Sequence, residues 1–251
     1  MGTDVTLKSR AQFHLLEQKK EQWSSIKDQP AARARYLELL GPVWARENCL
    51  LGEAEIPTET NTDLNPDRSW QMNNHAAAAC RLLSYVDHQT VLSAPDLLEL
   101  HGLAVGGDPS GGTYRLGPIT PVAKGHQPAD SDLLHEIVSN ALEWFDSGSF
   151  YEMHEVERAV LFLVKMVDIL PFERANGTTL RLASSFFLLK AGYPPAVIPA
   201  ARVDDYRLAI ENALALLTQP LVDLMADSVL DSLCFCVGGS SDPQTFRVLR
   251  R

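Results

Sequence analysis

The chain is poor in cysteine, with only four among its 251 residues: Cys49, Cys80, Cys234 and Cys236. Their spacings match no zinc-binding pattern, and four thiols in a chain of this length are too sparse for a disulfide scaffold. Free, buried thiols are therefore expected. The absence of a disulfide framework favours a reducing compartment, and we expect a cytoplasmic protein.

Long apolar runs and an excess of basic residues are also missing. No stretch approaches the ~20 apolar residues that a membrane span needs, and residues 1–13 contain no apolar segment of signal-peptide length. The 22 Lys and Arg residues are outnumbered by 32 Asp and Glu, which gives a net charge of −10. Nucleic acid and anionic membranes attract a basic face. We expect neither nucleic acid nor a membrane as a partner, although a single basic pocket is compatible with a net negative charge.

Apolar residues recur at helical spacing along most of the chain. This pattern predicts helices over residues 8–27, 30–51, 73–86, 94–105, 130–145, 155–169, 177–189, 204–225 and 227–237. Ser93 followed by Pro95 is typical of a helix start, and Gly192 followed by two prolines is typical of a helix end. The polar residues 56–67 predict a loop. The expected fold class is all-α.

One small β element is expected within the helical fold. Residues 106–117 are dense in glycine and are followed by Pro118-Ile-Thr-Pro-Val, a pattern that predicts a loop with a short hairpin. We divide the chain into an N-terminal helical extension (1–70), a main domain (71–237) and a flexible tail (238–251).

The candidate site lies between a strongly apolar helix and the helix that follows it. The helix over residues 155–169 is ended by Pro171, and the next begins near Gly177 after a short polar loop. The N-terminus of a helix presents unpaired N–H groups and the positive end of its dipole, which together bind anions. Gly177 lets a phosphate approach the backbone. The alternative is an ordinary helix–turn–helix corner, in which Asn176 and Gly177 only make the turn.

Side chains after this turn suit the same ligand. Thr178 and Thr179 can donate from their hydroxyl groups, and Arg181 can add a bidentate fork. A nucleotide or phosphorylated small molecule is the ligand class that this chemistry favours.

Residues 170–181, LPFERANGTTLR, resemble the active-site motif of the Fic family, His-Pro-Phe-x-Asp/Glu-Gly/Ala-Asn-Gly/Lys-Arg-x-x-Arg. The matching positions are Pro171, Phe172, Ala175, Asn176, Gly177 and Arg181. Leu100-His101 and Gly112-Thr-Tyr-Arg115 resemble upstream family segments, and the stretch up to His126 and Pro128 resembles the flap that holds the target side chain. The likeness covers roughly residues 95–215. It implies a Fic-fold helical domain with a short β-hairpin flap, and it implies that Phe172 belongs to the ligand site.

Three chemical positions of the motif differ here. The histidine that deprotonates the target hydroxyl is Leu170, which has no titratable group. The acidic residue that holds Mg²⁺ is Arg174, and a cation does not ligate a hard metal. The first motif arginine, which binds phosphate, is Thr178. Ordinary AMP transfer is therefore not expected, and neither is a bound metal.

Other residues are candidates to compensate for these losses. Glu173 lies one residue from the usual acidic position, and Arg174 can replace Mg²⁺ as the counter-charge of a phosphate. His126 is the candidate replacement base because the flap faces the loop in the family; its alternative role is a solvated loop histidine. His154 lies about four helical turns from Leu170, which is too far for a base.

A regulatory residue is also implied by the resemblance. Many Fic proteins carry an inhibitory helix, Ser/Thr-x-x-x-Glu-Gly/Asn, whose glutamate pairs with the second motif arginine. Its nearest match is Cys49-Leu-Leu-Gly-Glu-Ala, which implies that Glu53 pairs with Arg181. The alternative is an ordinary charged helix end.

Three functions stay open at this point. The first is a degenerate Fic protein that binds a nucleotide or another phosphate-containing ligand without ordinary AMP transfer. The second is an enzyme with redirected chemistry in the same cleft, either nucleotidyl or related transfer or a non-phosphoryl reaction. The third is an interaction module that binds a protein partner through residues 112–128 by strand addition.

Overall fold

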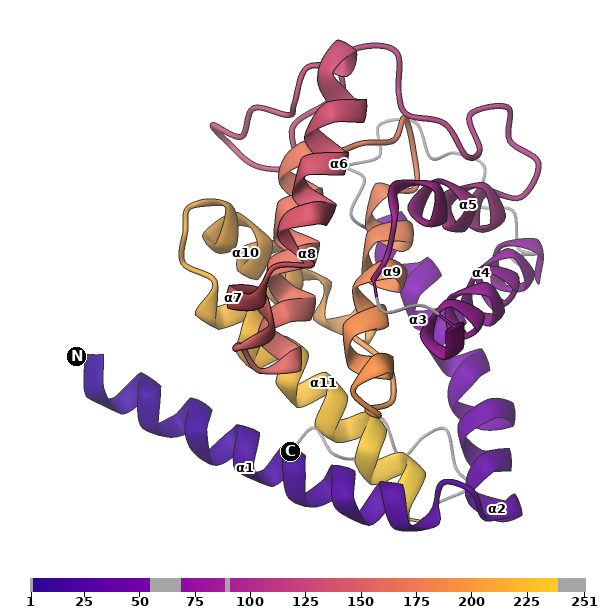
Figure 1. Ribbon diagram of the computed structural model, residues 1–251, viewed down its shortest axis with the longest axis vertical. Coiled ribbons are helices and arrows are strands. Elements are labelled where there is room, and N and C mark those ends of the chain that lie inside the picture. Colours follow the sequence, from indigo (N-terminus) through magenta and orange to yellow (C-terminus); the bar gives the residue numbers. More distant parts are fainter. Residues whose placement is uncertain (1, 55–68, 89–90, 239–251) are drawn as a thin grey trace.

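The computed structural model describes residues 2–54, 69–88 and 91–238, and within these ranges the fold is all-α, as expected (Figure 1). The elements are α1 (Gly2–Ile26), α2 (Pro30–Ala34), the π-helical η1 (Arg35–Leu40), α3 (Gly41–Ala54), α4 (Ser69–His88), α5 (Ala94–Val105), the 3₁₀ turn η2 (Ser131–Leu133), α6 (Leu134–Trp144), α7 (Gly148–Tyr151), α8 (Glu155–Ile169), α9 (Asn176–Lys190), the 3₁₀ turn η3 (Ala200–Arg202), α10 (Val203–Leu214) and α11 (Gln219–Gly238). The loop expected over residues 56–67 and nearly all of the expected tail lie outside the described residues.

The pair α8 and α9 forms the centre of the molecule (Figure 1). Helices α3, α4 and α5 pack on α9, whereas α6, α10 and α11 pack on α8. Every residue of α9 from Thr179 to Leu189 is buried, as expected for a helix that is covered on all sides. Since α3 contacts α9 directly, the end of the expected N-terminal extension belongs to the packing around the candidate site. No helix in the described ranges is long and apolar enough to cross a bilayer.

The predicted helix starts are supported by their capping groups. Ser93 caps α5, because its Oγ accepts from the N–H of Asp96 at 3.4 Å while the Asp96 carboxylate accepts from the N–H of Ser93 at 2.8 Å. Such a reciprocal capping box satisfies two of the unpaired N–H groups of the first turn. His154 and Glu157 form an equivalent pair at the start of α8.

Two predictions about local structure were wrong. The break near the C-terminus falls at residues 215–218 rather than at residue 226, because Leu216 adopts a left-handed φ of 68° and Pro220 opens α11. The expected β-hairpin is not formed either: residues 106–130 are described in full and contain no strand. This segment contains four prolines, which cannot donate to a strand ladder.

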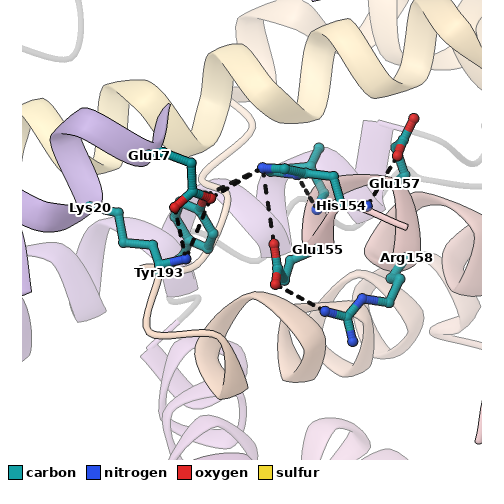
Figure 2. A network of polar contacts seen from close by, with 8 residues as sticks. Glu17, Lys20, His154, Glu155, Glu157, Arg158 and Tyr193 are labelled. Atoms are coloured by element: carbon teal, nitrogen blue, oxygen red, sulfur yellow. Dashed lines mark hydrogen bonds and ion pairs between the residues drawn. The ribbon is translucent and has the colours of Figure 1, made fainter. Parts of the chain in front are cut away.

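Helix α1 lies along α11 and reaches the start of α8 through a polar cluster (Figure 2). Glu17 accepts hydrogen bonds from Lys20 at 3.1 Å and from the Tyr193 hydroxyl. The Nε2 of His154 lies 3.4 Å from the same carboxylate, and the His154 ring stacks on Phe13 with centroids 4.1 Å apart.

Glu17, His154 and Glu155 bring their potential metal-ligating atoms within 4.8 Å of one another. The cluster is nevertheless balanced without an ion. The Nδ1 of His154 accepts from the N–H of Val156 at 3.2 Å, so a neutral ring carries its proton on Nε2 and has no nitrogen to offer a metal. Glu155 pairs with Arg158 at 3.0 Å. We therefore interpret the cluster as a structural contact that holds α1 against the start of α8.

Candidate ligand-binding site

The connection between α8 and α9 begins and ends in strained backbone. Leu170 closes α8 with φ 49° and donates its N–H to the carbonyl oxygen of Met166 at 2.9 Å. Ala175, at the N-cap of α9, has φ 55°. A left-handed conformation costs a non-glycine residue about 1–2 kcal/mol. The surrounding structure must supply this free energy, and such strain is concentrated at functional sites.

Asn176 fixes the shape of the loop between these two positions. Its Oδ1 accepts from the N–H of Phe172 at 3.0 Å, and its Nδ2 donates to the Phe172 carbonyl at 2.7 Å. The Phe172 ring is fully buried and stacks on His101 with centroids 3.9 Å apart. Phe172, predicted as a ligand contact, therefore supports the loop from behind.

His101 supports the loop with both ring nitrogens. Nδ1 accepts from the N–H of Gly112 at 3.2 Å, so the proton of a neutral ring sits on Nε2, which donates to the carbonyl oxygen of Arg174 at 3.2 Å. Burial lowers the pKa of His101 to about 4. The resemblance pointed to His101 only as part of an upstream segment; the structure makes it a direct support of the loop.

Arg115 joins the segment 106–130 to the same loop. Its Nε donates to the Leu170 carbonyl at 2.8 Å, and its Nη1 and Nη2 donate to the carbonyls of Gly117, at 2.6 Å, and Ala129. The backbone N–H of Arg115 donates to the Pro171 carbonyl at 3.0 Å. One buried guanidinium therefore joins Gly117 and Ala129 of this segment to Leu170 of the motif loop.

An open cleft of about 360 Å³ borders the start of α9. Its lining comes from the motif loop, α8, α10 and residue 122: Val122, Val167, Leu170, Asn176, Gly177, Tyr206, Arg207, Ile210 and Glu211. Leu170 contributes an aliphatic surface at the position of the family's base. Asn176 and Gly177, the first two residues of α9, line the cleft, so the positive end of the helix dipole lies at its edge. Ala175, at the N-cap position, makes no side-chain hydrogen bond to this end of the helix.

The predicted ligand residues divide into two groups. Asn176 and Gly177 line the cleft, and Thr178 is partly exposed in the same turn. Arg174 is turned away to pair with Asp108 at 2.9 Å. Glu173 is exposed on the surface, and it does not line the cleft.

Thr179 does not face the cleft. Its side chain is fully buried, and its Oγ1 has no hydrogen-bond partner among the described residues. The sequence spacing placed it in the first turn of α9 correctly, but the helix phase turns it toward the interior.

His126 is not placed to act as a base in the cleft. Its Nε2 donates to the Asp168 carbonyl at 2.9 Å, and its Nδ1 accepts from the N–H of Val122 at 3.3 Å. With a side chain only 2% exposed, it is not a solvated histidine either. It ties the segment 106–130 to the end of α8.

Arg181 is buried between α3 and α10. Its Nε donates to Oδ1 of Asn48 at 2.7 Å, its Nη2 donates to the Asn48 carbonyl at 3.0 Å, and its guanidinium lies 5.3 Å from the Tyr206 ring centroid. Glu53 lies in the last turn of α3, but its side chain is outside the described part, so its pairing with Arg181 stays a prediction. A Cβ on Gly52 would lie 2.3 Å from Thr178 Oγ1, which shows how closely α3 approaches this turn.

The chain resembles adenylyltransferases in sequence. It is 32% identical over 165 residues to the protein adenylyltransferase Fic of Drosophila willistoni and equally to that of Drosophila mojavensis; the match covers 63% of this chain and 32% of each relative. The chain thus spans about a third of the length of these relatives. No protein-family model matches it.

Solved structures share the architecture. Fic-1 from C. elegans superposes with a TM-score of 0.74 at 20% identity, covering 94% of this chain and 74% of that one. A Fic-domain-containing signaling protein from Bacteroides thetaiotaomicron gives 0.73 at 18% identity, covering 91% of this chain and all of that one. Fold and motif define an all-α protein built around a helix–loop–helix unit that carries the candidate ligand site. The chain is thus similar in sequence to Fic adenylyltransferases and shares the fold of Fic-domain proteins.

Proposed function

We propose that this protein is a degenerate member of the Fic family. It binds a nucleotide or another phosphate-containing ligand at residues 170–181 without ordinary AMP transfer. The observation that carries the proposal is the identity and placement of Leu170. It lines the cleft where the family's base belongs, and an aliphatic side chain cannot accept the proton of an attacking hydroxyl. The nearest histidine on the facing segment, His126, has both nitrogens engaged.

Binding of an anion is supported by groups that remain. Gly177 lines the cleft at the start of α9, whose N-cap residue offers no side-chain oxygen to its N–H groups. Arg181 adds a fixed positive charge close behind this turn. A ligand phosphate at this position is therefore favoured by backbone donors and by charge.

Magnesium has little support at this site. Arg174 occupies the position of the family's metal ligand and pairs with Asp108, while Glu173 is exposed outside the cleft. We therefore propose that binding is independent of Mg²⁺, with the α9 N-terminus in place of the metal as the main counter-charge.

Thermal shifts with ATP, UTP and CDP-choline, each with and without Mg²⁺, test this function. A ligand that binds only the folded state raises its stability, so at least one compound should raise the Tm without metal, and Gly177→Val should abolish the shift. Absence of any shift with every compound contradicts the proposal. Transfer of label from these compounds to protein, dependent on Asn176, would instead support redirected transfer chemistry.

A protein partner at residues 112–128 is the second candidate, supported by the exposure of Leu116 (96%) and Val122 (45%). Because this segment contains no strand, we propose contact through these apolar side chains rather than strand addition. Leu116→Asp should abolish partner binding and leave the nucleotide-induced Tm shift unchanged.

A further inference from the structure

A second cavity lies at the opposite end of the α8–α9 pair from the motif loop. It has a volume of about 120 Å³, and its walls come from residues 91–92 and from α6, α7, α8 and α9. It shares no lining residue with the cleft beside Gly177. Because a helix rises about 1.5 Å per residue, Arg158 in its wall lies about 18 Å along α8 from Leu170. The two sites are therefore separate.

Aromatic rings form the floor of this second cavity. Phe145, Phe186 and Phe187 line it, and all three side chains are buried. The rings of Phe186 and Phe187 are perpendicular with centroids 5.7 Å apart, and the Phe145 ring lies 6.3 Å from that of Phe187. Edge-to-face clusters of this kind favour contact with a further ring. A cavity of ~150 Å³ holds one benzene molecule, so the size of this one suits a single ring whose polar group reaches the opening.

Two cationic side chains border the same cavity, Arg158 of α8 and Lys190 of α9. Only Nη2 of Arg158 has an acceptor among the described residues, which is Oε1 of Glu155 at 3.0 Å (Figure 2). Its Nε is buried and has no acceptor there, and Nη1 has none either. Nζ of Lys190 donates to the Val86 carbonyl at 2.8 Å and pairs with no carboxylate in the described ranges.

The charges of the lining residues favour an anion. Glu155 is the one carboxylate among them, and its charge is balanced by Arg158. This pairing leaves the charge of Lys190 uncompensated. The guanidinium carbon of Arg158 lies 5.3 Å from the centroid of the Tyr151 ring, which also lines the cavity. Hydrogen bonds from cations to a carboxylate are stronger than those between neutral groups, so a carboxylate is the polar group that this lining suits.

We propose that this cavity binds a small aromatic carboxylate. The ring lies against the phenylalanine floor, and the carboxylate accepts from Nη1 of Arg158 and Nζ of Lys190. The site does not depend on the proposed function, because it uses no residue of the motif loop.

Titration with sodium benzoate at constant ionic strength, followed by ¹H–¹⁵N NMR of the whole chain, tests the site. Benzoate should cause saturable shifts of the amides of Phe145, Phe187 and Ala191, and the amide of Gly177 in the cleft should not respond. Benzamide has the same shape without the charge, so it should bind about tenfold more weakly.

Matched variants separate the charges from the apolar floor. Lys190→Gln should weaken benzoate binding about fivefold and leave benzamide binding unchanged. Arg158→Met should weaken benzoate binding about tenfold. Ala191→Leu adds volume to the wall and should abolish binding of both compounds. Lys165→Gln removes an exposed cation of α8 outside the cavity, and this control should bind benzoate as the wild type does.

The outcomes decide between this site and its alternatives. Absence of saturable shifts at the cavity amides of the wild type overturns the site. Equal affinities for benzoate and benzamide, or unchanged benzoate affinity in Lys190→Gln, overturn the assignment to a carboxylate. If Arg158→Met does not fold, Lys190→Gln and Ala191→Leu carry the test. None of these results bears on nucleotide binding at the cleft, which Gly177→Val tests separately.

Discussion

Arg115 and Leu170, 55 residues apart in sequence, are joined by a hydrogen bond of 2.8 Å between the guanidinium Nε and the Leu170 carbonyl. The bond attaches the irregular segment 106–130 to a residue in left-handed backbone. Because α8 ends at Leu170, the same guanidinium also places a positive charge at the negative end of the α8 dipole. The start of the motif loop is therefore held from outside the loop.

The first prediction concerns this guanidinium. Arg115→Met should lower the free energy of unfolding by about 2–4 kcal/mol, because the Leu170 and Gly117 carbonyls lose charged donors in a buried environment. Urea denaturation measures the change. Arg115→Lys keeps the charge but lacks the planar fork, so it should restore only part of the loss; full wild-type stability in the lysine variant would refute this account.

Ala175 provides a test of the backbone strain. Its φ of 55° suits glycine better than alanine, so Ala175→Gly should stabilise the fold by about 0.5–1 kcal/mol after allowance for the more flexible unfolded chain. Ala77→Gly, at an exposed site within α4, should destabilise by about 1 kcal/mol. Opposite signs in thermal unfolding are required; a loss of stability at both sites would mean that Ala175 is not strained.

Restoring the motif base should not restore transfer. Leu170→His alone is expected to show no labelling of protein from ATP and Mg²⁺, because the metal position is still Arg174 and the phosphate position is still Thr178. The matched variant adds Arg174→Asp and Thr178→Arg to this change. Labelling of protein by the Leu170→His variant would show that the motif histidine is the only group that the protein lacks for transfer.

Acid should destabilise the fold through its buried histidines. Burial lowers the pKa values of His75 to about 3 and His101 to about 4, and it also lowers that of His154. The unfolded chain then binds protons near pH 6.5 while the folded chain does not, so stability is greatest above pH 6.5 and falls toward pH 4. The slope approaches ~1.4 kcal/mol per pH unit for each histidine.

Urea midpoints measured from pH 8 to pH 4 test this linkage. His101→Gln should flatten the dependence between pH 6.5 and pH 4, because it removes one of the titrating groups. A profile identical to that of the wild type would exclude His101 as a source.

The sequence predicted the helices and the position of the loop between α8 and α9 because their signals are local. Apolar periodicity located α8 and α9, and Ser93 and Pro171 marked helix ends. The prediction of a β-hairpin in the segment 106–130 was wrong because the structure of this segment depends on Arg115, which has partners far away in sequence. Thr179 and His126 were assigned from spacing and family likeness, but their orientation depends on helix phase and on contacts with α8. The contact between Asn48 and Arg181 could not be predicted because a lone asparagine inside a helix belongs to no sequence motif.

Helix α8 is held at both ends: its N-cap residue His154 contacts Glu17 of α1, and His126 and Arg115 donate to carbonyl groups at its C-terminal end. Such a helix has few ways to open locally, so its amide protons should exchange with solvent only when the whole molecule unfolds. The loop that follows α8 should likewise open only when the whole molecule unfolds. A ligand at the cleft would then meet a surface whose shape is maintained by the global cooperativity of folding.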